Sequence, residues 1–165
     1  MKIKGKGVLT GDNIDTDIVI PGRYLVLQDP KELAKHAMEG IDANFPKKVE
    51  KGALLVAGKN FGCGSSREEA PVALKYAGVK CVIAQSFARI FYRNSINVGL
   101  PVLETKDARL IDEGDELEVD VEKGTIKDLT KGIEIKASPL PAFIMEIIKD
   151  GGLVEHLRKK LGTNA

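Results

Sequence analysis

The residues best suited to chemistry lie in a glycine-rich loop, Gly58 to Arg67. Its glycines allow tight turns and let the backbone approach a ligand closely. Ser65 and Ser66 supply two hydroxyl groups, and Arg67 supplies a planar guanidinium group that suits a carboxylate or a phosphate. Because a helix is expected to begin at the end of the loop, its unpaired N–H groups and positive dipole end also favour an anion. The loop therefore predicts a site for a small anion with two hydroxyls beside it.

Familiar phosphate and nucleophile motifs do not fit this loop. A nucleotide P-loop requires Gly-Lys-Ser or Gly-Lys-Thr at the helix start, where this chain has Gly-Ser-Ser-Arg at positions 64–67. A dinucleotide fingerprint requires a small residue at the position of Arg67, and a nucleophile elbow requires glycine there. A hydrolase triad would need His36 or His156, which we expect to be surface or structural residues.

A simpler interpretation of the same segment is helix capping. Either serine could cap the next helix, with Glu68 or Glu69 as the acidic residue of a capping box. However, Cys63, the two serines and Arg67 gather just beyond an apolar strand candidate, Ala53–Ala57. Ligands collect at the carboxyl ends of strands in open α/β sheets, so this position favours ligand binding over capping alone.

The elements around the loop predict a parallel sheet. Short apolar runs at 53–57, 79–84 and 100–103 are typical of buried strands. The first two are each followed by a predicted helix, and the second helix runs from a Ser86 cap to about Asn97. Strands that alternate with helices indicate right-handed parallel crossovers.

The segments before and after this core predict further strands and helices. Residues 2–10 are expected to form an edge strand and residues 16–20 a second strand, and a helix should begin at an Asp29 cap and end at Gly40. Residues 115–121 and 132–136 alternate apolar and charged side chains, as an antiparallel pair would. Helices are expected at 141–149 and 153–160. We therefore expect residues 1–165 to form a single α/β domain, with a parallel βα core beside an antiparallel β-rich part.

The composition of the chain disfavours several classes of function. The 165 residues carry 25 basic and 24 acidic side chains, a net charge of +1 that favours neither nucleic acid nor an anionic membrane as a partner. No apolar run follows the basic N-terminus, so no signal peptide is expected, and no segment is long enough to span a bilayer. Two cysteines and two histidines predict neither a disulfide framework nor a metal site, which makes a cytoplasmic location the default.

Three motifs together resemble a known family. Residues 62–68 (Gly-Cys-Gly-Ser-Ser-Arg-Glu) and 85–90 (Gln-Ser-Phe-Ala-Arg-Ile) resemble the swivelling domain of the aconitase superfamily. Residues 12–17 (Asp-Asn-Ile-Asp-Thr-Asp), followed by 20–25 (Ile-Pro-Gly-Arg-Tyr-Leu), resemble the opening of the small subunits of 3-isopropylmalate dehydratase. The resemblance spans roughly residues 10 to 105, in the family's order.

The resemblance implies a fold, a partner and a reaction. The fold would be the swivelling β/β/α domain. The partner would be a large subunit that carries a [4Fe–4S] cluster held by three cysteines, so this chain would bind no cofactor itself. The reaction would be a hydro-lyase step in leucine biosynthesis, which interconverts 2-isopropylmalate and 3-isopropylmalate by dehydration and rehydration. A subunit that keeps the fold without the chemistry is an alternative that intact Ser65, Arg67 and Asp17 disfavour.

The resemblance also implies roles for individual residues. Ser65 would be the base that removes a proton from the carbon next to a carboxylate. Arg67 would bind the substrate carboxylate, with Ser66 and Gly64 beside it. Asp17 would orient an arginine. Arg89 and Arg93, one turn apart on a predicted helix, are interpreted first as structural residues.

Val26 and Leu27 lie in the stretch after residues 23–25 (Arg-Tyr-Leu), and by resemblance this stretch helps to recognise the variable part of the substrate. An apolar pair suits an isopropyl group and would leave a third carboxylate unpaired, which disfavours homoaconitate. Citraconate or 2-methylmalate would also suit such a pair, and the small subunit of a homoaconitase or of a broad hydro-lyase is the alternative within the same family. Alternatively, both residues are simply core residues of a strand.

Overall fold

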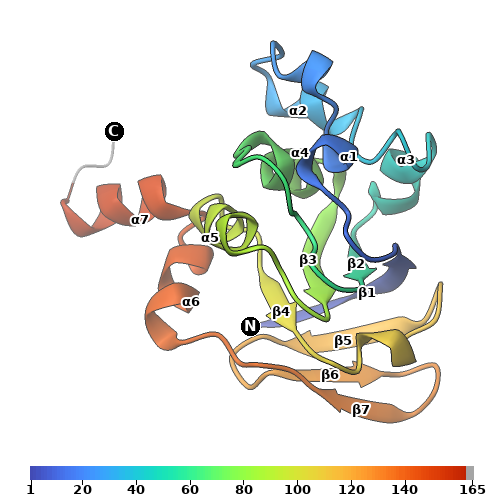
Figure 1. The fold of residues 1–165 in the computed structure, drawn as a ribbon. Helices are drawn as coiled ribbons and strands as arrows, with labels where there is room; N and C mark the ends of the chain where they lie inside the picture. Colours follow the sequence, from blue (N-terminus) through green and yellow to red (C-terminus); the bar gives the residue numbers. More distant parts are fainter. Residues whose placement is uncertain (163–165) are drawn as a thin grey trace.

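The protein is described by a computed structural model covering residues 1–162, and its main feature is a seven-stranded mixed sheet (Figure 1). The strand order is β4-β3-β2-β1-β5-β6-β7. The first four strands in this order are parallel and the last four are antiparallel, with β1 belonging to both parts. The bounds are β1 (Lys2–Leu9), β2 (Ala53–Ala57), β3 (Val79–Ala84), β4 (Val102–Glu104), β5 (Glu116–Asp120), β6 (Thr125–Asp128) and β7 (Ile133–Lys136). The α/β class with a parallel core and an antiparallel part is confirmed.

Strand β2 lies between two hydrophobic cores, which explains its unbroken apolar sequence. Leu55 and Ala57 belong to the core formed with helices α4 (Glu69–Ala77) and α5 (Arg89–Asn97). Leu54 and Val56 point the other way, into a core shared with β5, β6 and helix α6 (Ala142–Lys149). The sheet therefore curls so that its antiparallel strands cover one face of the parallel part (Figure 1).

The strand predicted at residues 16–20 is wrong, because this segment forms the short helix α1 (Thr16–Val19). The β-branched side chains of Thr16, Ile18 and Val19 favour a strand. Asp15 overrides that preference, since its carboxylate accepts a hydrogen bond from Ile18 N at 2.8 Å and caps the helix.

Three short elements follow before β2: a 3₁₀ turn (Gly22–Tyr24), α2 (Pro30–Ala34) and α3 (Phe45–Val49). Asp29 caps α2 as predicted, by accepting from Lys31 N at 2.9 Å. The helix ends at Ala34 rather than Gly40, although Ala37 and Met38 beyond it are buried. Helix α3 was not predicted.

Two expectations about strand positions are also wrong. β1 was expected at an edge, but it lies in the middle of the sheet, between β2 and β5. The segments 115–121 and 132–136 were expected to pair, but β6 lies between β5 and β7. β6 has only four residues, Thr125–Asp128, so its alternation is too short to be noticed in the sequence.

The serines expected to cap helices do not do so. Helix α4 begins at Glu69, after Glu68, whose side chain makes no capping bond. Helix α5 begins at Arg89 after Ala88, while Ser86 Oγ accepts a hydrogen bond from Asn60 N at 2.8 Å in the neighbouring loop. The serines that were predicted as caps lie in loops instead. The Ser65 side chain is therefore available for another role.

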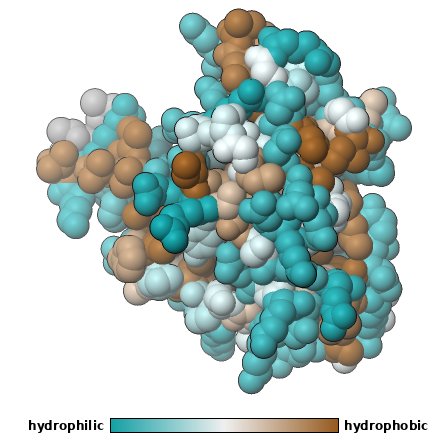
Figure 2. Space-filling view, viewed as in Figure 1, coloured by the Kyte–Doolittle hydropathy of each residue, from teal (hydrophilic) through white to brown (hydrophobic). Residues whose placement is uncertain are grey.

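The chain ends in helix α7 (Leu153–Lys160), which projects from the body and has no buried residue (Figure 1). Its bounds are those predicted. Val154 and Leu157 are exposed on this helix, and Figure 2 shows hydrophobic colour along the projecting segment. Among residues 1–162, no helix is long and apolar enough to cross a membrane. A short 3₁₀ turn, Ala108–Leu110, follows β4.

Candidate active site

Two loops lie side by side at the carboxyl ends of β1 and β2. The loop after β1 donates from Asn13 N to Lys59 O at 2.8 Å, and it receives a bond from Gly62 N to Ile14 O at 2.7 Å. Asp15 and Cys63 form an isolated parallel bridge at the end of this pairing. The pairing brings the Asp-Asn-Ile-Asp-Thr-Asp motif against the Gly-Cys-Gly-Ser-Ser-Arg motif, at the edge where parallel strands place ligands.

Gly58 and Gly62 permit this close packing. A side chain at Gly58 would overlap the carboxylate of Asp12, whose Oδ1 accepts from Lys59 N at 2.7 Å. Gly62 has a φ of 82°, and a side chain there would overlap the ring of Phe91 in helix α5. The glycines thus hold the loop against its neighbours, as their positions in the sequence predict.

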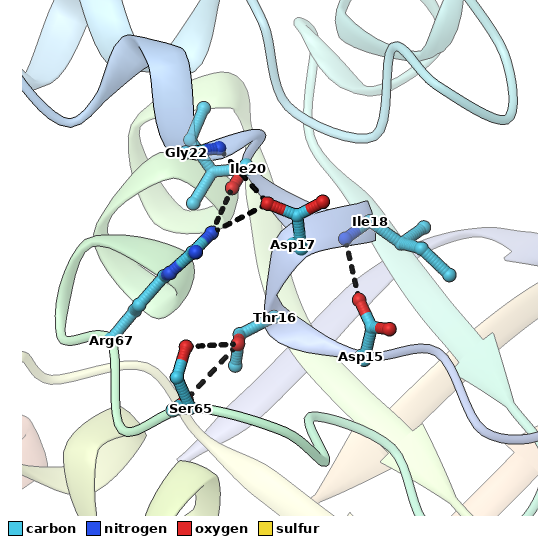
Figure 3. A network of polar contacts seen from close by, with 8 residues as sticks. All are labelled: Asp15, Thr16, Asp17, Ile18, Ile20, Gly22, Ser65 and Arg67. Atoms are coloured by element: carbon cyan, nitrogen blue, oxygen red, sulfur yellow. Dashed lines mark hydrogen bonds and ion pairs between the residues drawn. The ribbon is translucent and has the colours of Figure 1, made fainter.

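Ser65 lies over the start of helix α1, next to Thr16 (Figure 3). Thr16 Oγ1 is 3.0 Å from the carbonyl oxygen of Ser65, to which it donates, and 3.2 Å from Ser65 Oγ. Thr16 is 2% exposed, whereas Ser65 is exposed. Ser65 therefore lies at the surface, and the buried Thr16 hydroxyl is within hydrogen-bond distance of both its carbonyl oxygen and its Oγ.

Arg67 extends from the same loop to the C-terminal end of α1 (Figure 3). Its Nη1 donates to Asp17 Oδ1 at 2.9 Å and to the carbonyl oxygen of Ile20 at 3.1 Å. Asp17 Oδ1 also accepts from Gly22 N at 3.0 Å. The hydrogen bond from Arg67, followed by that from Gly22, holds the pKa of Asp17 below its usual value, so Asp17 is a carboxylate partner for Arg67.

The remaining predicted residues lie around this pair. Ser66 and Gly64 are exposed beside Ser65, and Gly64 has a φ of 97°. Val26 is 82% exposed, so the alternative that it is a core residue of a strand is wrong. Leu27 is half-buried and packs against the core below it.

A cluster of four side chains holds the segment between Gly22 and Val26 in place. The Tyr24 ring stacks on His36 with ring centroids 3.7 Å apart, and the Arg23 guanidinium carbon lies 4.7 Å from the centroid of the Tyr24 ring. Glu39 accepts from Arg23 at 2.9 Å and pairs with His36 Nδ1 at 2.8 Å. His36 is thus a structural residue, as expected, and it has no part in a hydrolase triad.

His156, the second histidine, pairs with Asp150 Oδ2 at 2.8 Å at the junction of α6 and α7. It is likewise structural. Arg89 and Arg93 are exposed on α5.

The donor groups of this chain do not fit an iron–sulfur cluster. Cys63 is half-buried, and Cys81 is buried in β3, where burial raises the pKa of its thiol to about 12. Within residues 1–162, no group of three His, Cys, Asp or Glu side chains could hold a metal ion. A cluster would need thiolate ligands from elsewhere.

Sequence reasoning missed two parts of the site. The carbonyl of Ile20 binds Arg67 because residues 16–19 form a helix, which was predicted as a strand. Thr16 was noticed only as the neighbour of Asp17. Its position at the start of a helix capped by Asp15, facing the serine loop, was the available signal.

Comparison with known proteins gives consistent results. The model of the aconitase C-terminal domain family matches residues 9–108. The 3-isopropylmalate dehydratase small subunit of Caldanaerobacter subterraneus subsp. tengcongensis is 58% identical over 160 residues, which is 96% of this chain and 99% of that protein. The isopropylmalate/citramalate isomerase small subunit of Methanocaldococcus jannaschii is 58% identical over 163 residues, 98% of this chain and 97% of that protein.

A solved structure agrees with these relatives. The crystal structure of 3-isopropylmalate dehydratase from Methanocaldococcus jannaschii matches with a TM-score of 0.92 and 52% identity, and the match covers 98% of this chain and 96% of that one. The fold is therefore that of this solved structure. The chain belongs to the aconitase C-terminal domain family, as a member of the 3-isopropylmalate dehydratase small subunits.

Proposed function

We propose that this chain, together with a large subunit, interconverts 2-isopropylmalate and 3-isopropylmalate by removing and re-adding water. The observation that carries the proposal is the placement of Ser65 and Arg67. Ser65 is an exposed residue, and Arg67, which is partly buried, is held by Asp17 and the Ile20 carbonyl. A pair placed in this way at the surface is half of a site, which a partner closes and shields from water.

Arg67 binds a carboxylate of the substrate in this proposal. A guanidinium group has five N–H donors in a rigid fork. Both hydrogens on Nη1 are used by Asp17 Oδ1 and the Ile20 carbonyl. We assign the donors on Nη2 and Nε to the substrate, because a planar fork matches a carboxylate with two parallel bonds. Ser66 and the backbone at Gly64, both exposed beside the pair, complete the contact.

Ser65 acts as the base. Its alkoxide takes the proton from the carbon next to a carboxylate and becomes a hydroxyl, while the hydroxyl group leaves the neighbouring carbon as hydroxide. Return of that proton from Ser65 to the hydroxide gives water and regenerates the alkoxide, so that the net products are the unsaturated acid and water. Addition of water in the opposite orientation then yields the isomer. A serine hydroxyl is a weak acid, and the positive charge of Arg67 together with nearby hydrogen-bond donors stabilises the anion.

The iron–sulfur cluster belongs to the large subunit in this proposal. Support comes from the donor set of this chain, in which Cys81 is buried and Cys63 has no second thiol beside it in the described residues. The small-subunit names of the relatives also support a separate large partner. We assign no step involving the cluster to the residues of this chain.

Val26 selects the substrate. It is 82% exposed at the end of a segment that begins at Gly22, next to the Arg67 guanidinium. An exposed apolar side chain suits an isopropyl group, and it leaves a third carboxylate without a partner. The name of the Methanocaldococcus jannaschii relative, isopropylmalate/citramalate isomerase, supports citramalate, which is 2-methylmalate, as a second substrate. Homoaconitate is disfavoured.

The proposal is tested with the chain and its large subunit purified together without oxygen. The ultraviolet absorbance of the unsaturated acid is followed with isopropylmalate, citramalate and homoaconitate, each supplied separately. We expect turnover of isopropylmalate, slower or comparable turnover of citramalate, and none with either subunit by itself. A complex that turns over none of the three acids, or only homoaconitate, would contradict the proposal.

A further inference from the structure

Thr16 combines two properties that a threonine with a purely structural role does not need. Its side chain is 2% exposed, and its Oγ1 is within hydrogen-bond distance of two atoms of one residue, Ser65. The distances are 3.0 Å to the Ser65 carbonyl oxygen and 3.2 Å to Ser65 Oγ. Backbone bonds from Thr16 N to Cys63 O at 2.8 Å and from Ile20 N to Thr16 O at 3.0 Å fix its position.

A threonine hydroxyl has one proton and two lone pairs, so it can donate only one strong bond at a time. While Ser65 carries its own proton, Thr16 donates to the Ser65 carbonyl and Ser65 Oγ donates to Thr16 Oγ1. Once Ser65 loses that proton, two oxygen atoms face each other at 3.2 Å without a hydrogen between them. The contact becomes favourable again only when Thr16 rotates its proton toward Ser65 Oγ.

We propose that Thr16 is a positioning residue for the reaction, and that its hydroxyl turns from the carbonyl oxygen to Oγ of Ser65 when that serine becomes an anion. The proton stays on Thr16 throughout, and only the acceptor of its hydrogen bond changes. The inference rests on the proposed role of Ser65 as the base. A hydrogen bond to the charged form of a group favours that form, so Thr16 lowers the pKa of the Ser65 hydroxyl.

The surroundings of Thr16 favour this role. A buried hydroxyl next to an anion is worth more than one in water, because the local dielectric constant is lower. The serine loop lies close to Thr16, since a Cβ at Gly64 would stand in ordinary van der Waals contact with Thr16 Oγ1, at 3.5 Å. Thr16 is also a β-branched residue at the first position of α1, which restricts its χ1 rotation and keeps Oγ1 pointed at Ser65.

The test is the pH dependence of turnover by the complex with the large subunit, measured for Thr16→Val and Thr16→Ser. Valine keeps the shape and removes the hydroxyl. We expect Thr16→Val to lower kcat by about 100-fold, the effect of removing one donor to a developing anion, with KM nearly unchanged. The rising limb of the pH profile of kcat should lie at higher pH in Thr16→Val than in the wild type, because Ser65 then ionises at a higher pH. Thr16→Ser keeps the hydroxyl, so its kcat and its pH profile should be close to those of the wild type.

Thr105 provides a matched control. It is also buried, at 5% exposure, and its Oγ1 donates to the Lys136 carbonyl at 2.8 Å, far along the chain from Ser65. Thr105→Val should lower stability without moving the pH profile. An unchanged profile in Thr16→Val would overturn the proposal. If Thr16→Val does not assemble, Thr16→Ala replaces it, and full kcat in that variant would overturn the proposal equally. Failure of the wild-type complex to turn over any substrate would instead refute the proposed function.

Discussion

Arg67 Nη1 and Asp17 Oδ1 lie 2.9 Å apart although 50 positions separate the two residues in the sequence. Their side chains differ in exposure, 23% for Arg67 and 67% for Asp17. An ion pair this exposed adds little to folding stability. Its consequence is geometric, because it holds the guanidinium group at the end of α1 and close to the exposed serine loop.

Replacing Arg67 by Lys should separate charge from geometry. A lysine keeps one positive charge, but it cannot bind Asp17, the Ile20 carbonyl and a substrate carboxylate with a rigid fork. We expect kcat/KM to fall about 10- to 100-fold, as lost charge-assisted hydrogen bonds of ~1.5–3 kcal/mol would cause. Steady-state kinetics of the complex measures the effect. Arg158→Lys on helix α7 serves as the control, and an equal loss in both variants would contradict the assignment.

Replacing Val26 by Arg should change which acid is preferred. The new guanidinium group would lie at an exposed position and pair with a third carboxylate. We expect the ratio of kcat/KM for homoaconitate over isopropylmalate to rise at least about tenfold. Ile133→Arg, an exposed position on β7, is the matched control and should leave the ratio unchanged. An unaltered ratio in Val26→Arg would remove this residue from substrate selection.

Gly62→Ala and Gly114→Ala form a pair that tests the packing of the site loop. Their φ angles are nearly equal, 82° and 84°, so both variants carry the same backbone strain of about 1–2 kcal/mol. A side chain at Gly62 overlaps Phe91, while nothing lies within 4 Å at Gly114. Gly62→Ala should therefore cost about 1–3 kcal/mol more in urea unfolding. Equal losses would show that Gly62 is not needed for packing.

The buried carboxyl group of Asp128 should make the stability of the fold depend on pH. It is 1% exposed, its Oδ2 has no hydrogen-bond donor, and its carboxyl group is a neighbour of that of Asp115. Burial and the hydrogen bond with Asp115 raise the pKa of Asp128, while that hydrogen bond lowers the pKa of Asp115. The two carboxyl groups can bond only if Asp128 keeps a proton. Lys131 and Asp112 are the other charged groups at this site, with Lys131 Nζ 3.3 Å from Asp115.

The sign of the effect follows from proton binding. Above the unfolded pKa of 3.8, the folded state holds the Asp128 proton longer than the unfolded state, so the free energy of unfolding falls as pH rises through the raised pKa. Asp128→Asn keeps a donor for Asp115 and has no proton to lose. Urea unfolding across this pH range should show the decline in the wild type and a flatter curve in the variant. Parallel curves would contradict a proton held by Asp128.

The parallel core was predictable because burial on both faces leaves a plain signal. β2 and β3 appear in the sequence as apolar runs with the same bounds that the structure gives them. Segments whose structure depends on one polar side chain were not predictable in this way. Three of the four residues 16–19 have β-branched side chains, yet the segment is a helix that the Asp15 side chain caps.

The site was predictable as a set of motifs and unpredictable as a set of contacts. Ser65, Arg67 and Asp17 were singled out as candidates because they stand in motifs that resemble those of a known family. The Ile20 carbonyl and the Thr16 hydroxyl were not, because their positions depend on backbone bonds between two loops, such as Thr16 N to Cys63 O at 2.8 Å. Residue types do not reveal which carbonyl a loop will present.

Turnover by a complex that carries Ser65→Ala tests most directly whether Ser65 is the base of an active site that two subunits share. Ser138→Ala, at another exposed serine, is the matched control, and binding of the large subunit is measured for both. We predict that Ser65→Ala binds the large subunit normally and loses essentially all conversion of isopropylmalate, while Ser138→Ala retains it. Conversion by Ser65→Ala at the wild-type rate would contradict the role of Ser65 as the base.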